Sequence, residues 1–147
     1  MPGMIGKLKL YLDTNVLLSL LAGEEKGGVK LGENVGRLLY EAADGKYQIL
    51  ISEHTANELL LAGVPAEFID QAIRPMLLLD GGDLLLANED ILRGALKISR
   101  IQEMPFLRAL HIVFAQRNNA VIISRDFDML HGARSLAGVM KPEDLLA

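Results

Sequence analysis

Three acidic residues stand at places where an enzyme could use them together. Asp13 directly follows the apolar segment 8–12, and Asp126 follows the apolar segment 120–124. Glu58 lies one to two turns into a helical pattern that begins after the segment 47–51. Carboxylates gathered in one crevice repel one another unless a hard divalent cation binds between them. The three residues therefore indicate a Mg²⁺ or Mn²⁺ site, which suits phosphoryl chemistry because the ion activates water and neutralises the leaving oxygen.

The elements that must position these acids alternate between strands and helices. Strands are predicted at 8–12, 47–51 and 120–124, with a last edge strand at Val139–Met140. Helical patterns are predicted at 16–22, 34–43, 52–62, 65–73, 83–99 and 105–117, with short ones after Asp126 and from Glu143. Pro75 is expected to end the helix at 65–73, and Asp83 to cap the helix that follows it. Apolar strands alternating with helices predict a three-layer α/β/α fold with a central, mostly parallel sheet, as one domain over 1–147.

Asp13 and Asp126 each have two interpretations at the ends of their strands. Either residue alone is more often a helix N-cap than a metal ligand. In an open parallel sheet, however, ligands bind outside the carboxyl ends of the strands, and both residues are predicted at that edge. If the two strands are neighbours, both carboxylates face the same crevice, which favours a site.

Composition excludes several classes of protein. The chain of 147 residues has no cysteine, so it has no disulfide framework, thiolate zinc site or cysteine nucleophile. It has no run of about 18 apolar residues and no evident signal cleavage site, from which we expect a cytoplasmic protein without a membrane span. The net charge of −4 argues against non-specific nucleic-acid binding, although Glu103 is the one acid among six bases from Arg93 to Arg125. Those bases form either a solvated helix face or a basic wall beside the acidic pocket.

Three motifs in series resemble the PIN domain, the fold of VapC-type toxin ribonucleases and of several RNA-processing nucleases. They are LDTNVLL at 12–18, IS at 51–52 with ANELL at 56–60, and IISRDFD at 122–128. The resemblance covers nearly the whole chain. It implies an α/β/α domain that cleaves single-stranded RNA with Mg²⁺ or Mn²⁺, leaving a 5′-phosphate and a 3′-hydroxyl.

The resemblance also assigns roles to particular residues. Asp13, Glu58 and Asp126 match the family's first, second and fourth acids, and are therefore the expected catalytic residues and metal ligands. Thr14, Asn15 and Ser124 match the polar residues that steady those carboxylates. Asp128 is a further supporting candidate, which either faces the crevice or caps the short helix after Asp126.

The sequence departs from the family at the third acid. In the segment Arg108-Ala109-Leu110-His111-Ile112, arginine occupies the acid's place. Three carboxylates and one guanidinium carry a formal charge of −2 instead of −4, which weakens divalent-ion binding. Three outcomes stay open: the site is inactive, Arg108 binds an RNA phosphate as Arg125 is also expected to do, or another acid substitutes. The candidate substitutes are Glu103, Glu89 and Asp128.

The histidines carry weaker signals. His54 and Glu58 have the i, i+4 spacing of metal ligands on one helix face, but a two-residue match is not specific. His111 lies among apolar residues and is expected to be a packed, hydrogen-bonded side chain.

Two functions from different classes follow. The first is a divalent-metal-dependent ribonuclease acting on single-stranded RNA, as the toxin of a toxin–antitoxin pair, with an antitoxin protein as partner. The second is a catalytically weakened or silent PIN-fold protein that binds RNA or a protein. A phosphoaspartate domain built on Asp13 ranks below both, because no second acid lies in the spacing it needs. The resemblance also implies a homodimer, in which the leucine-rich stretch 76–86 forms an apolar surface unless it packs in the core.

Overall fold

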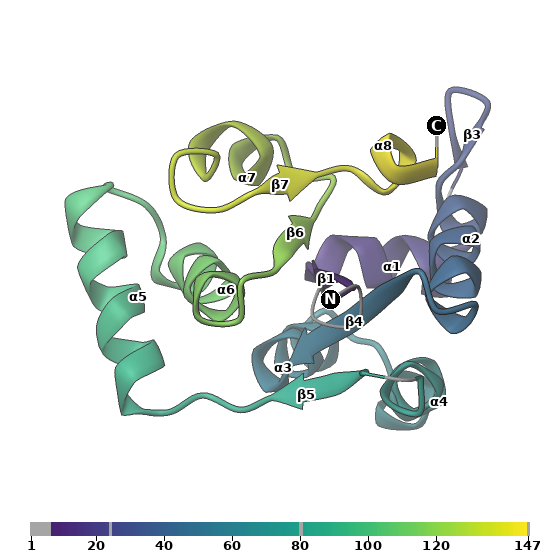
Figure 1. Ribbon diagram of the computed structural model, residues 1–147, viewed down its shortest axis with the longest axis horizontal. Coiled ribbons are helices and arrows are strands. Elements are labelled where there is room, and N and C mark those ends of the chain that lie inside the picture. The colour runs from purple at the N-terminus through teal and green to yellow at the C-terminus, as the bar shows by residue number, and fades with distance from the viewer. Residues whose placement is uncertain (1–6, 24, 80, 147) are drawn as a thin grey trace, which may run out of the picture.

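A five-stranded parallel sheet runs through the middle of the computed structural model (Figure 1). Its strands are β1 (Leu8–Leu12), β4 (Tyr47–Ser52), β5 (Asp83–Leu85), β6 (Val121–Ile123) and β7 (Val139–Met140). They stand in the order β5-β4-β1-β6-β7, and each neighbouring pair is parallel. The structure describes residues 7–23, 25–79 and 81–146, so the ends of the expected domain lie outside the described residues. Parallel strands bring their carboxyl ends to one edge, and β1 and β6 are neighbours there, as the proposed shared crevice requires.

Helices cover both faces of the sheet. Their bounds are α1 (Thr14–Ala22), α2 (Leu31–Ala43), α3 (Glu53–Leu61), α4 (Ala66–Leu77), α5 (Glu89–Ile101), α6 (Phe106–Arg117), α7 (Phe127–Gly132) and α8 (Pro142–Leu146). A short antiparallel hairpin, β2 (Glu25–Lys26) and β3 (Val29–Lys30), lies between α1 and α2. No helix in the described ranges is long and apolar enough to cross a membrane.

The alternation of side chains along β1 divides the core into two clusters. Leu10 and Leu12 pack with buried residues of α1, α2, α3 and α4 on one face of the sheet. Tyr11 points to the opposite face and packs with buried residues of α5, α6 and α7. Successive strand residues point to opposite faces, so the all-apolar β1 is covered on both sides. The predicted three-layer α/β/α fold is therefore confirmed.

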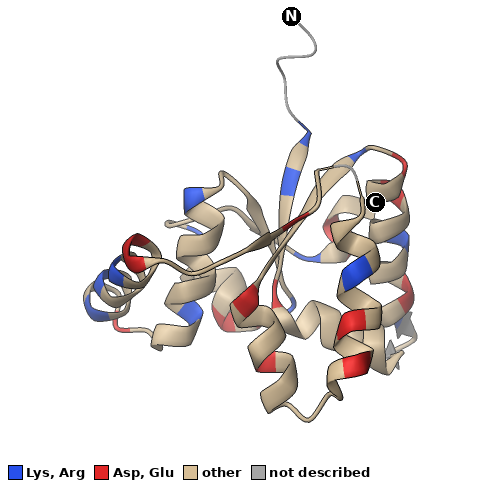
Figure 2. Cartoon of the chain, turned by 90° about the horizontal axis from the view of Figure 1, so that it is seen from below, with Lys and Arg blue, Asp and Glu red and all other residues tan. Residues whose placement is uncertain are grey.

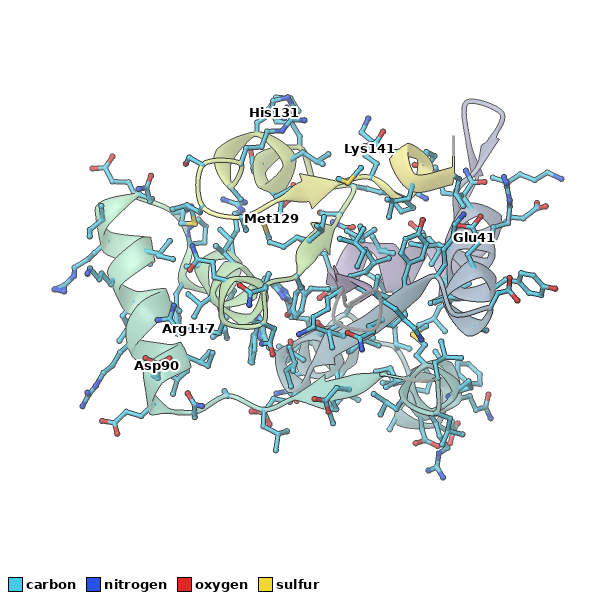
Figure 3. The ribbon with its side chains drawn as sticks, in the orientation of Figure 1. Glu41, Asp90, Arg117, Met129, His131 and Lys141 are labelled. Atoms are coloured by element: carbon cyan, nitrogen blue, oxygen red, sulfur yellow. The ribbon has the colours of Figure 1, made fainter. Side chains whose placement is uncertain are left out.

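Helix α5 is the outermost element beside α6. Arg117 Nε on α6 donates a hydrogen bond of 2.8 Å to Asp90 Oδ2 on α5, and both residues are labelled in Figure 3. The helix begins after Asn88, whose side chain accepts a hydrogen bond from the amide of Ile91. The prediction that Asp83 caps this helix was wrong. Residues 83–85 instead form β5, which pairs with β4 at the sheet edge, because tertiary pairing overrides the local cap signal.

Pro75 lies inside a helix and does not end it. The sequence predicted that the helix beginning after Pro65 is broken there, but α4 continues through Pro75 to Leu77. Proline usually disrupts a helix interior because it lacks an N–H donor and clashes with the preceding turn. Here the burial of Ile73 and Met76 on the same helix face keeps the last turn in place.

The C-terminal helix is fixed to the sheet edge by a charged contact. The Arg125 guanidinium pairs with the Glu143 carboxylate and donates a hydrogen bond of 2.9 Å to the Leu31 carbonyl. Asn34 Nδ2 also donates to Glu143, at 3.1 Å. Burial raises the pKa of Glu143, but the hydrogen bonds from Arg125 and Asn34 outweigh it and hold that pKa below its ordinary value.

We expect Glu143→Gln to lower the free energy of unfolding by about 1–3 kcal/mol at pH 7, because a hydrogen bond to a charged group is lost. The folded-state pKa of Glu143 lies below its unfolded value. Its contribution is therefore complete above the unfolded pKa and disappears as pH falls through the folded pKa. Urea unfolding of both proteins across an acid series measures this, and a difference that stays constant down to the most acid pH contradicts it.

Candidate active site

The Asp13 side chain is buried and fixed at the end of β1. Its amide donates to the Ile123 carbonyl at 3.0 Å, which extends the pairing of β1 with β6 by one residue. Its Oδ1 accepts from the Thr14 amide at 2.8 Å, as an N-cap of α1 does. Its Oδ2 accepts from Ser124 Oγ at 2.7 Å. Asp13 is thus a helix cap and a cleft residue at once, so the two interpretations of the sequence are compatible.

Asn15 and Ser124 join the ends of β1 and β6. Asn15 Nδ2 donates to Asp13 Oδ2 and to Ser124 Oγ, at 3.3 Å in each case. Asn15 Oδ1 accepts from the Arg125 amide at 3.0 Å, and Ser124 Oγ accepts from the Asp126 amide at 3.0 Å. Because the same side chains contact both strand ends, they fix the Asp13 carboxylate relative to the backbone at Asp126.

Glu58 projects from α3 toward Asp13. Thr14 Oγ1 donates to Glu58 Oε1 at 2.6 Å, and His111 Nε2 lies 2.5 Å from the same oxygen. Burial raises the pKa of Glu58, but the hydrogen bonds from His111 and Thr14 lower it further than burial raises it. The net pKa is below the ordinary value, so Glu58 is ionised at neutral pH.

Arg108 lies between the two acids of the 126–128 segment. Its Nε is 3.8 Å from Asp126 Oδ2, and its Nη2 is 3.3 Å from Asp128 Oδ2. Asp126 also caps α7, accepting from the Asp128 amide at 3.3 Å. The guanidinium therefore neutralises part of the negative charge that the sequence assigned to a metal site.

A cleft of about 330 Å³ opens at this edge of the sheet. Its polar lining contains the three expected carboxylates together with Arg108 and His111. The lining residues are Asp13, Thr14, Asn15, Leu18, Glu58, Pro105, Leu107, Arg108, His111, Asp126 and Met129. Met129, labelled in Figure 3, is a buried residue of α7 that forms part of the apolar wall.

The remaining candidates do not line this cleft. Arg125 is engaged by Glu143 and the Leu31 carbonyl, so an RNA phosphate would have to displace an existing carboxylate. Glu103 lies in the turn between α5 and α6 with a φ of 52°, and lines a neighbouring pocket with Arg108 and Asp128. Glu89 pairs with Arg93 at the start of α5. The third candidate substitute acid, Asp128, pairs with Arg108, and like Glu103 and Glu89 it is absent from the cleft lining.

Two histidines lie beside Glu58, His111 in the cleft lining and His54 behind it, and sequence reasoning gave them little weight. His111 Nδ1 lies 2.5 Å from the Tyr11 hydroxyl, which in turn lies 2.7 Å from Ser52 Oγ. His54 Nε2 is 3.6 Å from Glu58 Oε1, and the two imidazole centroids are 4.6 Å apart. Burial lowers the pKa of His54, which keeps its ring neutral at pH 7. The i, i+4 spacing of His54 and Glu58 was the available signal, but nothing local pointed to the contact with His111.

The donor set fits a divalent cation in two ways. Asp13, Glu58 and Asp126 offer the carboxylate oxygens that Mg²⁺ and Mn²⁺ prefer. His54, Glu58 and His111 each offer one ligand atom, and these three atoms lie within 4.8 Å of one another. Glu58 belongs to both sets, and Arg108 stands at the Asp126 end of the cleft.

Comparison with known proteins found one family and several related folds. The PIN domain model matches residues 10–134. A toxin–antitoxin complex from Klebsiella pneumoniae has a chain 20% identical, with a TM-score of 0.62, over 90% of this chain and 97% of that one. The VapBC2 structure from Rickettsia felis, bound to a DNA fragment from its promoter, has a chain that is 12% identical, with a TM-score of 0.67. The match covers 91% of this chain and 98% of that one. VapBC-1 from nontypeable Haemophilus influenzae has a chain that is 19% identical, with a TM-score of 0.60. The match covers 92% of this chain and 99% of that one. The search of curated proteins gave no match.

Ser124→Ala tests the bridge between the strand ends. The variant leaves Asp13 Oδ2 without its shortest hydrogen bond and the Asp126 amide without an acceptor. We expect the free energy of unfolding to fall by about 1–3 kcal/mol, as chemical denaturation measures it. Ser135→Ala, at an exposed serine, is the matched control and should change it little. Equal stability of the two variants would refute the bridging role.

Proposed function

The chain belongs to the PIN domain family, and we propose that it is a divalent-metal-dependent ribonuclease acting on single-stranded RNA. The observation that carries the proposal is the convergence of Asp13, Glu58 and Asp126 in one cleft at the carboxyl edge of the sheet. These residues come from three separate elements, α3 and the ends of β1 and β6. If Asp13 and Asp126 served only as helix N-caps, Glu58 on α3 would not need to lie beside Asp13.

The carboxylates would hold Mg²⁺ or Mn²⁺, and the surroundings of Asp13 and Glu58 prepare these two for an ion. Asp13 is fixed by Ser124 and Thr14, so little side-chain freedom is lost on binding. Glu58 is ionised because hydrogen bonds hold its pKa low. A bound ion supplies an activated water and neutralises charge on the phosphate.

Arg108 is proposed to bind the RNA backbone at the cleft rim. Its side chain is part of the lining, and a guanidinium can bind a phosphate with two parallel hydrogen bonds. Further basic residues lie on the α5–α6 side of the molecule (Figure 2). Among them Lys97 and Arg100 are exposed on α5, where they would extend the contact along a single strand. Arg125 is less suited to bind an RNA phosphate because its guanidinium is already paired with Glu143.

An antitoxin protein is the proposed partner. The solved structures that share this fold include toxin–antitoxin complexes from several bacteria, and this chain would act as the toxin of such a pair. A homodimer is part of the same proposal. Leu78, Leu84 and Leu86 of the leucine-rich stretch are exposed, while Met76 is buried, so this stretch divides between surface and core.

The competing function is a silent PIN-fold protein that binds RNA or a protein. The ion pairs of Arg108 with Asp126 and Asp128 favour it, because they occupy the acids that an ion would need.

Asp13→Asn is expected to lower the cleavage rate of a labelled single-stranded RNA in Mn²⁺ or Mg²⁺ by at least about a hundredfold, because one charged ligand is lost. Asp44→Asn, at an exposed acid, is the control and should cleave normally. Undiminished cleavage by the Asp13 variant would refute the assigned site. If neither protein cleaves and Arg108→Asp gains activity, the silent alternative is correct.

Arg108→Gln is expected to raise Mn²⁺ affinity by about three- to tenfold, because it removes a fixed positive charge beside Asp126. Isothermal titration calorimetry measures the dissociation constant. Arg117→Gln makes the same change on the same helix, at a residue outside the cleft that pairs with Asp90, and should leave the affinity unchanged. An equal affinity in wild type and the Arg108 variant would mean that the arginine does not oppose the ion.

A further inference from the structure

Two imidazoles and one carboxylate lie close together where α3 and α6 meet at the cleft. Glu58 Oε1 is 2.5 Å from His111 Nε2 and 3.6 Å from His54 Nε2. All three atoms lie within 4.8 Å of one another. We propose that His54, Glu58 and His111 bind a transition-metal ion of the Zn²⁺ or Co²⁺ type, in a site with different donor chemistry from the oxygen-only set.

His54 supplies an observation that ordinary packing does not explain. Its side chain is buried, yet its Nε2 has no hydrogen-bond partner among the described residues. Leaving a buried polar atom without a partner costs free energy. The same nitrogen faces Glu58, so an ion shared between them would satisfy it.

The hydroxyl groups on the Nδ1 side of His111 suit a metal-bound imidazole. Without an ion, His111 Nε2 donates to Glu58. An ion at Nε2 would replace that proton, and the ring would then carry its proton on Nδ1 and donate it to the Tyr11 oxygen. The Tyr11 hydroxyl then donates to Ser52 Oγ at 2.7 Å, and Ser52 donates to Thr55 Oγ1 at 3.2 Å. Such an outer chain fixes the tautomer and the orientation of a metal-binding histidine.

The charge distribution favours this corner for an ion of that type. Two imidazoles and one carboxylate suit Zn²⁺ and Co²⁺, whereas Mg²⁺ prefers oxygen ligands. Arg108 stands by Asp126 at the other end of the cleft, so its charge opposes the oxygen-only set most strongly. Asp13 Oδ1, 3.5 Å from His111 Nε2, is available on the same side as a further ligand.

The site shares Glu58 with the proposed catalytic set, but its existence does not require nuclease activity. The test therefore contains no RNA. The chain has three histidines, so their imidazole NMR signals can be followed one by one in the unaltered protein. His131, which stacks on Phe127 and is exposed, is the internal reference.

We expect ZnCl₂ to shift the signals of two histidines and leave the third in place, and MgCl₂ to shift none. The His131→Gln variant identifies the unaffected signal and should retain both shifts. His54→Gln should weaken Co²⁺ binding, followed by its visible absorption, by at least about tenfold. Tyr11→Phe, which keeps the ring volume but removes the acceptor for His111 Nδ1, should weaken it in the same direction.

Several results would overturn the inference. One is that Zn²⁺ shifts no histidine signal or shifts that of His131. Another is that folded His54→Gln protein keeps the wild-type Co²⁺ spectrum and affinity. If His54→Gln does not fold, the NMR titration of the unaltered protein still decides the question. A protein that cleaves RNA in Mg²⁺ but shows no Zn²⁺ shifts refutes the histidine site alone, and one with the shifts but no cleavage refutes the nuclease alone.

Discussion

The burial of the Asp13 carboxylate is the constraint on which the rest of this edge depends. A buried charge is tolerated only when hydrogen bonds replace the lost water. Here the partners come from α1, through the Thr14 amide, and from the end of β6, through Ser124. Satisfying one carboxylate therefore requires β1 and β6 to be neighbours with their ends aligned. The same requirement brings Asp126 to the cleft, because its amide donates to Ser124.

Arg108 changes the electrostatics of the cleft without changing its architecture. The helix that carries it is buried along most of its length, from Ala109 to Ala115, and packs in the core beneath the sheet. Arg108 comes directly before this buried stretch and its side chain is 24% exposed, so the core does not require an apolar residue there. Arginine cannot lose its charge, so it pairs with Asp126 and Asp128 instead. The negative charge left unpaired is concentrated at Asp13 and Glu58, next to the two imidazoles.

Glu58 belongs to both of the proposed ligand sets, the carboxylates and the histidine cluster. It accepts from Thr14 on one side and contacts His111 on the other, while His54 on its own helix approaches the same oxygen. A carboxylate with several donors around it is held ionised and oriented. The oxygen-ligand set and the nitrogen-containing set that we propose therefore share a single side chain.

The sequence by itself determined the strands at the centre of the sheet and the polar residues that end them, because apolar runs and cap residues act over a few neighbours. Asp13, Ser124 and Asp126 were predicted from that local pattern together with the family resemblance. Only the tertiary structure decided that residues 83–85 pair as β5, since a three-residue strand gains its hydrogen bonds from β4. It also decided that His111 meets Glu58, 53 residues away in the chain. That contact depends on how α3 and α6 pack against opposite faces of the sheet and meet at its edge, which no local pattern encodes.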